Sequence, residues 1–200
     1  MTASVLIPTI GRPTLNAAVR SALESRHVCE VLVVADGASA LRAAVETLSS
    51  VEDERLRVAW VTTPGVPDWG HSIRHVFGKH LKGDYAIWLD DDNLLYASRF
   101  DDDVDEHGAD ADVIFFRVEF EMAGRGNRFV PSGRPPASSN VDGMGIVVKT
   151  SILKTVPWPR CSPKPGKDGG DRHGDWLFFD ALRSAGHSFR ITSTIIGIHR

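Results

Sequence analysis

The sequence predicts an α/β fold with a mostly parallel central sheet. Short β-like runs in the first half, such as residues 30–35, alternate with segments whose apolar residues recur at helical spacing. Strands that alternate with helices imply parallel neighbours joined by right-handed crossovers. After residue 92 the pattern changes to β-like runs separated by irregular segments, which predicts mixed strands on the far side of the sheet.

Length and composition indicate one domain. The chain has 200 residues, 42% of them hydrophobic, so it can bury one sizeable core. We therefore expect a single domain over residues 1–200.

The elements expected in the first half are short apolar runs for strands and segments with an apolar stripe for helices. Pro13 suits the start of a helix because its fixed φ matches helical geometry. In chain order the elements are a strand at 4–9, a helix that opens at 12–14 and runs to Leu23, a strand at 30–35, a helix ending near residue 48, a strand at 57–62, a helix at about 71–81 and a strand at 85–89.

The second half contains three β-like runs and one helix. The β-like runs cover 112–122, 145–149 and 188–199. A compact amphipathic segment at 176–185 precedes Gly186, a residue type that often follows a helix end. The second half therefore predicts strands of mixed direction beside one late helix.

Two segments of the second half are rich in glycine and proline. Residues 123–140 are expected to be irregular, and residues 157–174 hold too many helix and strand breakers for a packed element. The loop at 157–174 is either a functional lid or a disordered segment.

Charge and cysteine content exclude several classes of protein. The formal net charge is −3, which gives no general basic footprint for nucleic acids or anionic membranes. Cys29 and Cys161 have no metal-ligand spacing and no secretory segment points to a disulfide, so we expect a reduced, cytoplasmic protein. No apolar run approaches the ~20 residues that span a bilayer, so no transmembrane segment is expected.

Three adjacent carboxylates, Asp90, Asp91 and Asp92, directly follow the apolar run at 85–89. Adjacent acid groups repel one another, and this repulsion favours a bound cation. Hard oxygen ligands select Mg²⁺ or Mn²⁺, and ligands of open α/β sheets bind beyond the carboxyl ends of the strands. The other interpretation is a solvated acidic turn in which an aspartate caps the next helix.

The common phosphate-binding loops are missing from the sequence. It has no Gly-x-Gly-x-x-Gly turn and no Gly-x-x-x-x-Gly-Lys loop. Dinucleotide-binding and P-loop functions therefore lose their main support.

Four short motifs occur along nearly the whole chain in a fixed order. They are Val5–Thr9 with Arg12–Pro13, Glu30–Gly37, Gly83–Tyr85 leading to Leu89–Asp92, and Gly174–Trp176. In order and spacing the chain resembles the family 2 glycosyltransferases, which have the GT-A fold.

The resemblance implies one Rossmann-like GT-A domain of the nucleotide-diphospho-sugar transferase type. Residues 1–93 are then the half that binds the nucleotide sugar, and residues 94–200 are the half that binds the acceptor. The implied reaction moves a sugar from a nucleotide-diphospho-sugar donor to an acceptor hydroxyl, inverting the anomeric centre, with Mn²⁺ or Mg²⁺ as cofactor. We expect a soluble acceptor, and the sequence does not predict an oligomeric state.

The resemblance also implies which residues hold the donor. Thr9 and Asp36 fall where the family contacts base and ribose, and Arg74 where an arginine pairs with the diphosphate. Asp90 is expected on the ribose or on a metal-bound water, and Asp91 beside it in the donor site. From the residues alone, Asp36 also fits an ordinary Asp-Gly turn, and Arg74 also fits a surface position on a helix.

Two residues are implied as metal ligands and one as the catalytic base. Asp92 ends the family's Asp-x-Asp element, and His199 lies where some GT-A enzymes provide a histidine ligand. Asp175 falls at the family's Glu-Asp motif, although Gly174 replaces the glutamate. His199 is otherwise a frayed terminal residue, and Asp175 is otherwise a helix cap.

Other functions remain open at this point. A sugar-1-phosphate nucleotidyltransferase shares a related sheet and acidic site, but it needs a glycine-rich basic loop after the first strand. Residues 9–13 offer one glycine and one arginine only. A non-catalytic protein that binds nucleotide sugars is the third possibility, and Asp171 and His173 are rival bases near Asp175.

Overall fold

The structure is a computed structural model that describes residues 1–62, 68, 70–122, 126–130, 136, 140–160 and 174–200. The remaining residues lie outside the description. They include most of the loop expected at 157–174, together with Asp171 and His173.

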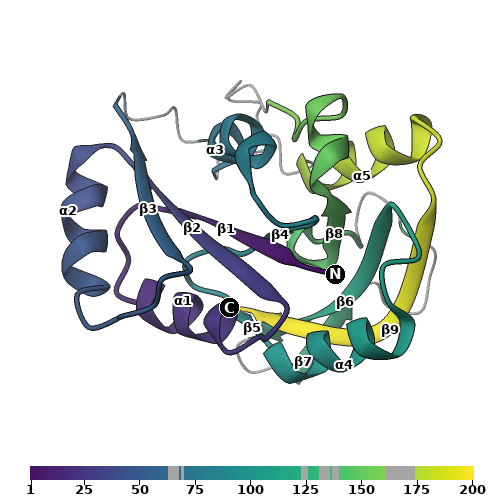
Figure 1. Cartoon of the computed structure of the whole chain (residues 1–200), viewed down its shortest axis with the longest axis horizontal. Helices are drawn as coiled ribbons and strands as arrows, with labels where there is room; N and C mark the ends of the chain where they lie inside the picture. The colour runs from purple at the N-terminus through teal and green to yellow at the C-terminus, as the bar shows by residue number, and fades with distance from the viewer. Residues whose placement is uncertain (63–67, 69, 123–125, 131–135, 137–139, 161–173) are drawn as a thin grey trace.

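One curled sheet organises the described part of the chain (Figure 1). Its first half is parallel and consists of β1 (Ala3–Thr9), β2 (Val28–Asp36), β3 (Leu56–Val61) and β4 (Tyr85–Trp88). The strand order is β3-β2-β1-β4, with parallel pairing throughout. All seven residues of β1 are buried because layers of helices cover both faces of this central strand.

The second half adds strands of mixed direction, as the sequence predicts. They are β5 (Leu94–Leu95), β6 (Val113–Met122), β7 (Gly126–Val130), β8 (Ile146–Lys149) and β9 (Phe189–His199). Strand β8 pairs antiparallel with both β4 and β6, whereas β9 runs parallel to β6. The predicted α/β class and the mostly parallel sheet with mixed strands beyond it are confirmed.

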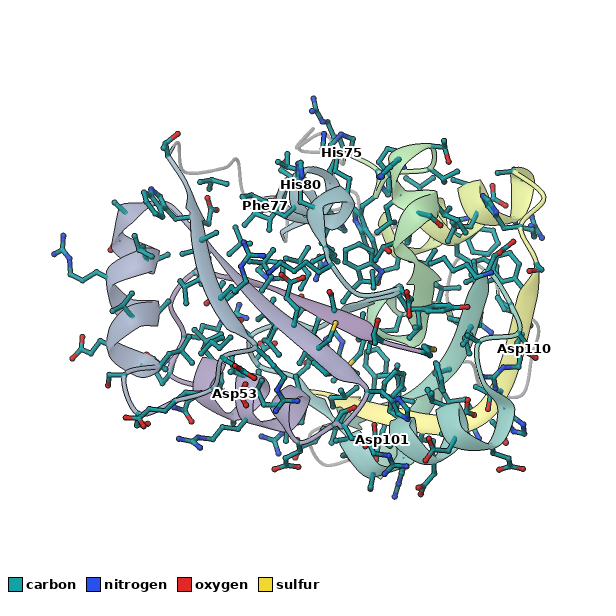
Figure 2. The ribbon with its side chains drawn as sticks, in the orientation of Figure 1. Asp53, His75, Phe77, His80, Asp101 and Asp110 are labelled. Carbon is teal, nitrogen blue, oxygen red and sulfur yellow. The ribbon has the colours of Figure 1, made fainter. Side chains whose placement is uncertain are left out.

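Helices cover the sheet on both sides (Figure 1). On one side lie α1 (Leu15–Leu23), α2 (Ala38–Thr47) and α4 (Ala97–His107), whose apolar residues join one buried cluster. On the other lie α3 (His71–Phe77) and α5 (Gly174–Ser184), which join a second cluster. In Figure 2 His75 and Phe77 mark the α3 side of the sheet, and Asp101 marks the α4 side.

Short 3₁₀ segments complete the fold. They are η1 (Gly78–His80), η2 (Gly143–Gly145) and η3 (Thr150–Lys154). The helix expected at about 71–81 therefore ends as an α-helix at Phe77 and continues as η1.

Three elements differ from the sequence expectation. Helix α4 and strand β5 were not expected, and β7 lies inside the segment expected to be irregular at 123–140. Strand β5 has only two residues, too few to show any periodicity. Helix α4 is hidden because its buried face carries Asp101 and Asp103 beside Phe100 and Val104, so the apolar period is interrupted.

The fold brings several strand ends to one edge. Strands β1, β2 and β4 are parallel, so Thr9, Asp36 and the turn after Trp88 meet at the same side of the sheet. Strand β9 ends there as well, because His199 lines the same cleft as these residues. Among the described helices, none combines the length and the apolar character that crossing a membrane requires.

Candidate active site

A cleft with a volume of about 490 Å³ opens at this edge of the sheet. Six of the eight residues expected in the site line it: Thr9, Asp36, Asp90, Asp91, Asp92 and His199. A second depression of about 500 Å³ lies at the start of α4 and is lined by none of the eight. The cleft at the strand ends is therefore the candidate site, although the depression at α4 is as large.

Asp91 and Asp92 share a counter-ion that the sequence analysis did not assign to the site. Arg12 Nη1 donates to Asp91 Oδ1 and to Asp92 Oδ2, at 2.8 Å each. Asp91 is buried and also accepts from Thr9 Oγ1 at 2.6 Å. The Asp92 side chain is 31% exposed, so it reaches the cleft more freely than Asp91, which is 4% exposed.

The surroundings of Asp92 favour the binding of a cation by its carboxylate. Burial raises the pKa of Asp92; Arg12 opposes this rise, while the charges of Asp90 and Asp91 add to it. A divalent ion at the cleft would relieve the repulsion among these acids. The acids do not cap the next helix, because α4 begins at Ala97.

Asp90 forms an ion pair with Arg74, which comes from α3. Arg74 is buried, so it is not a surface residue of its helix. Its guanidinium lies 5.1 Å from the centre of the Trp158 ring. Trp158 Nε1 in turn donates to His71 Nδ1 at 2.6 Å, and the two rings stack. His71 therefore holds the Trp158 ring against which the Arg74 guanidinium packs.

Asp36 and Gly37 do form a turn, with Gly37 at a φ of 92° that favours glycine. Asp36 still lines the cleft at the end of β2. The turn and the proposed contact with the donor are therefore compatible.

Asp175, in the first turn of α5, is not among the residues that line the cleft, but it is close enough to Asp90 for their charges to interact. Its Oδ2 accepts from the backbone N–H of Gly143 at 3.0 Å, so the carboxyl group faces another segment of the chain. Burial, followed by the nearby charge of Asp142, raises the pKa of Asp175 to about 7, while Arg74 acts in the opposite sense. A carboxyl group of this kind can take up a proton near neutral pH.

His199 ends β9 and is paired there, so it is not a frayed terminus. Its Nδ1 lies 3.1 Å from Asp142 Oδ2. This hydrogen bond raises the pKa of His199, burial opposes the rise, and the charges of Asp142, Asp90 and Asp92 add to it. Asp142 was not among the expected site residues.

The metal-binding side chains expected in the cleft fit a cation that binds together with a diphosphate. Within the described residues, no three histidine, cysteine, aspartate or glutamate side chains gather closely enough to hold a metal by themselves. Asp92 and His199 nevertheless line the same cleft. Mg²⁺ sites commonly use one or two carboxylates and complete the shell with substrate phosphates and water.

The glycine that replaces the family's glutamate has a structural reason. A Cβ at Gly174 would lie 2.3 Å from Cε1 of His71 and 2.7 Å from its Nε2. The imidazole of His71 thus fills the space that a side chain at position 174 needs.

Sequence reasoning predicted no contact of Arg12, Asp142 or His71 with the expected site residues. Arg12 and Asp91 are 79 positions apart in the sequence, and Asp142 and His199 are 57 apart. No local sequence pattern therefore predicts either contact. For Arg12 there were two signals: it belongs to the first motif, and it lies three residues after β1, at the carboxyl edge where ligands bind.

Comparison with solved structures shows the fold. The crystal structure of S. aureus TarS 1-349 in complex with UDP-GlcNAc is 19% identical, with a TM-score of 0.70, and the match covers 100% of this chain and 58% of that one. The mannosyltransferase PcManGT from Pyrobaculum calidifontis, in complex with GDP-Man and Mn²⁺, is 14% identical with a TM-score of 0.65, covering 98% and 56%. The predicted GT-A fold is confirmed, and the chain spans less than two thirds of the length of either structure.

Sequence comparison shows the family. No curated protein matches the chain. Residues 4–153, which contain the first three motifs and the cleft residues except those at the C-terminal end, match Glycosyl transferase family 2. Together with the GT-A fold, this match establishes that the chain belongs to glycosyl transferase family 2.

Proposed function

We propose that the chain is a metal-dependent glycosyltransferase that moves a sugar from a nucleotide-diphospho-sugar to an acceptor hydroxyl. The observation that carries the proposal is that one cleft, where three strands end, is lined by Arg12, His199 and Asp90 to Asp92. Arg74 pairs with Asp90, and the charges of both act on Asp175. The two solved structures of the same fold are complexes with UDP-GlcNAc, and with GDP-Man and Mn²⁺.

Residues of the first half would hold the donor. Thr9 and Asp36, at the ends of β1 and β2, are assigned to the base and ribose, and Asp90 and Asp91 to the neighbouring part of the donor site. Arg74 is assigned to the diphosphate, because a buried guanidinium next to the cleft offers charge-assisted hydrogen bonds to phosphate oxygens. Residues 1–93 are thus proposed as the donor half and residues 94–200 as the acceptor half.

Asp92 and His199 would hold the cation. A bound Mn²⁺ or Mg²⁺ would supply positive charge beside the diphosphate and so would stabilise the leaving nucleotide. Asp92 contributes a partly exposed carboxylate, and His199 contributes a ring nitrogen.

Asp175 would act as the base. Its carboxylate takes the proton of the acceptor hydroxyl while that oxygen attacks the anomeric carbon and the bond to the nucleoside diphosphate breaks. A single displacement of this kind inverts the anomeric centre. Cytoplasmic location and a soluble acceptor stay predictions.

Donor hydrolysis tests the proposal directly. Purified protein is incubated with UDP- and GDP-sugars, with and without Mn²⁺, and the released nucleoside diphosphate is measured. Release that needs both metal and an intact Asp92 supports the proposal. Release of pyrophosphate from a nucleoside triphosphate and a sugar phosphate would instead identify a nucleotidyltransferase. If the protein neither turned over nor bound any nucleotide sugar, it would be neither a glycosyltransferase nor a nucleotidyltransferase.

A further inference from the structure

Asp142, a buried acid outside the set of expected site residues, contacts His199, one of the two proposed metal-binding residues. The side chain of Asp142 is 8% exposed and precedes η2. Its Oδ1 accepts from the backbone N–H of Met144 at 2.9 Å, and its Oδ2 lies 3.1 Å from His199 Nδ1. Both carboxylate oxygens are therefore engaged, one by the chain's own turn and one by the imidazole.

The ring of His199 is held from a second direction. It stacks on Phe120 with the ring centres 4.5 Å apart and the planes 14° apart. Phe120 is also the partner of His199 in the pairing of β6 with β9. Next in the chain, the backbone N–H of Arg200 donates to Asn93 Oδ1 at 3.1 Å, which fixes the strand end to the turn that follows the aspartates.

These contacts select one ring nitrogen for a ligand. An imidazole between a stacked aromatic ring and a carboxylate keeps its orientation, because rotation would put a ring carbon against the carboxylate. With Nδ1–H donated to Asp142, Nε2 is the nitrogen that remains for a ligand. Histidines that bind metals usually donate their other N–H to such a partner, which fixes tautomer and orientation.

We propose that Asp142 is a positioning residue that presents Nε2 of His199 to the divalent cation of the cleft. This inference rests on the proposed function, since it needs a cation at Asp92 and His199. Among the described residues that line the cleft, Asp142 does not occur. The same turn also holds the base, because Gly143 N–H donates to Asp175 Oδ2.

Asp142→Asn tests this role with little change of shape. The asparagine oxygen can still accept from Met144 N–H, but the amide N–H then faces His199 Nδ1 and makes that nitrogen an acceptor. The proton moves to Nε2, which can no longer bind a metal. We expect the affinity for Mn²⁺ in the presence of UDP or GDP, measured by electron paramagnetic resonance titration, to fall about 10–100-fold.

A double variant separates positioning from general damage. In a His199→Gln background, Asp142→Asn should cause no further loss of Mn²⁺ affinity, because the residue through which it acts is gone. Asp103→Asn is the matched control, since Asp103 is an equally buried acid that anchors the other end of β9. This control should lower stability and leave Mn²⁺ affinity unchanged in the fraction that is folded.

The tautomer gives a readout that needs no metal. In ¹⁵N NMR spectra of the donor-free protein, His199 should carry a proton on Nδ1, and Asp142→Asn should shift the neutral ring to the Nε2–H form. Wild-type Mn²⁺ affinity in Asp142→Asn, or an equal further loss in the His199→Gln background, would overturn the inference and leave the proposed function intact. Absence of Mn²⁺ binding by the wild type with either nucleotide would instead overturn the metal-dependent function, and this inference with it.

Discussion

In the proposed mechanism, the chemistry depends most on Asp175. Its carboxyl group accepts from Gly143 N–H, and Asp142, Arg74 and Asp90 supply the nearby charges. We expect Asp175→Asn to keep donor binding and to lower kcat about 10²–10⁴-fold, because only the proton acceptor is lost. Steady-state transfer and calorimetric donor binding measure the two effects. Asp180→Asn, on the exposed face of the same helix, is the control, and full activity of Asp175→Asn would place the base elsewhere.

The raised pKa of Asp175 predicts a pH dependence. A base works in its deprotonated form, so activity should be lost as the pH falls through the pKa of about 7. The profile of kcat/KM against pH should therefore show an acidic limb near neutral pH. A limb near pH 4, the ordinary range of an exposed carboxyl group, would contradict the assignment.

Gly174 and His71 form a second residue-scale test. A methyl group at position 174 would lie 2.3 Å from the imidazole, which is itself held by Trp158. Gly174→Ala should lower the free energy of unfolding by about 1–3 kcal/mol through overpacking. Urea denaturation measures the loss, and His71→Ala in the same chain should recover part of it. Equal losses from Gly174→Ala with and without His71 would show that the clash is not the cause.

At the scale of elements, β9 carries His199 to the cleft and is anchored far from it. Asp103 of α4 accepts from Arg190, Thr192 and Thr194 of β9. Burial opposes the charge of Asp103, but these hydrogen bonds outweigh it and the pKa of Asp103 is lowered. Helix α4 therefore fixes the strand that brings the histidine to the site.

Removing this anchor should cost stability. Asp103→Ala leaves Arg190 without its buried partner, so we expect the free energy of unfolding to fall by about 3–5 kcal/mol. Asp110→Ala removes the other acid on the same arginine, but that side chain is 54% exposed, and the loss should stay below about 1 kcal/mol. Chemical denaturation compares the two, and similar losses would contradict the anchoring role.

At the scale of the whole molecule, local patterns predicted the parallel half well. Apolar runs ending in Thr9, Asp36 and Asp90 are features of single segments, and parallel pairing brings their ends together. The contacts of Arg12 with Asp91 and of Asp142 with His199 depend on packing between distant segments. No spacing within the sequence encodes such contacts, so the supporting residues of the site appeared only in the structure.

The central claim is that a divalent cation and a nucleoside diphosphate bind together in the cleft at the strand ends. A crystal structure with Mn²⁺ and UDP or GDP, with an anomalous map recorded at the manganese edge, tests it most directly. We predict one manganese peak between the diphosphate, Asp92 and Nε2 of His199, with the nucleoside beside Thr9 and Asp36. A nucleotide bound elsewhere, or bound in the cleft without manganese at these side chains, would contradict the claim.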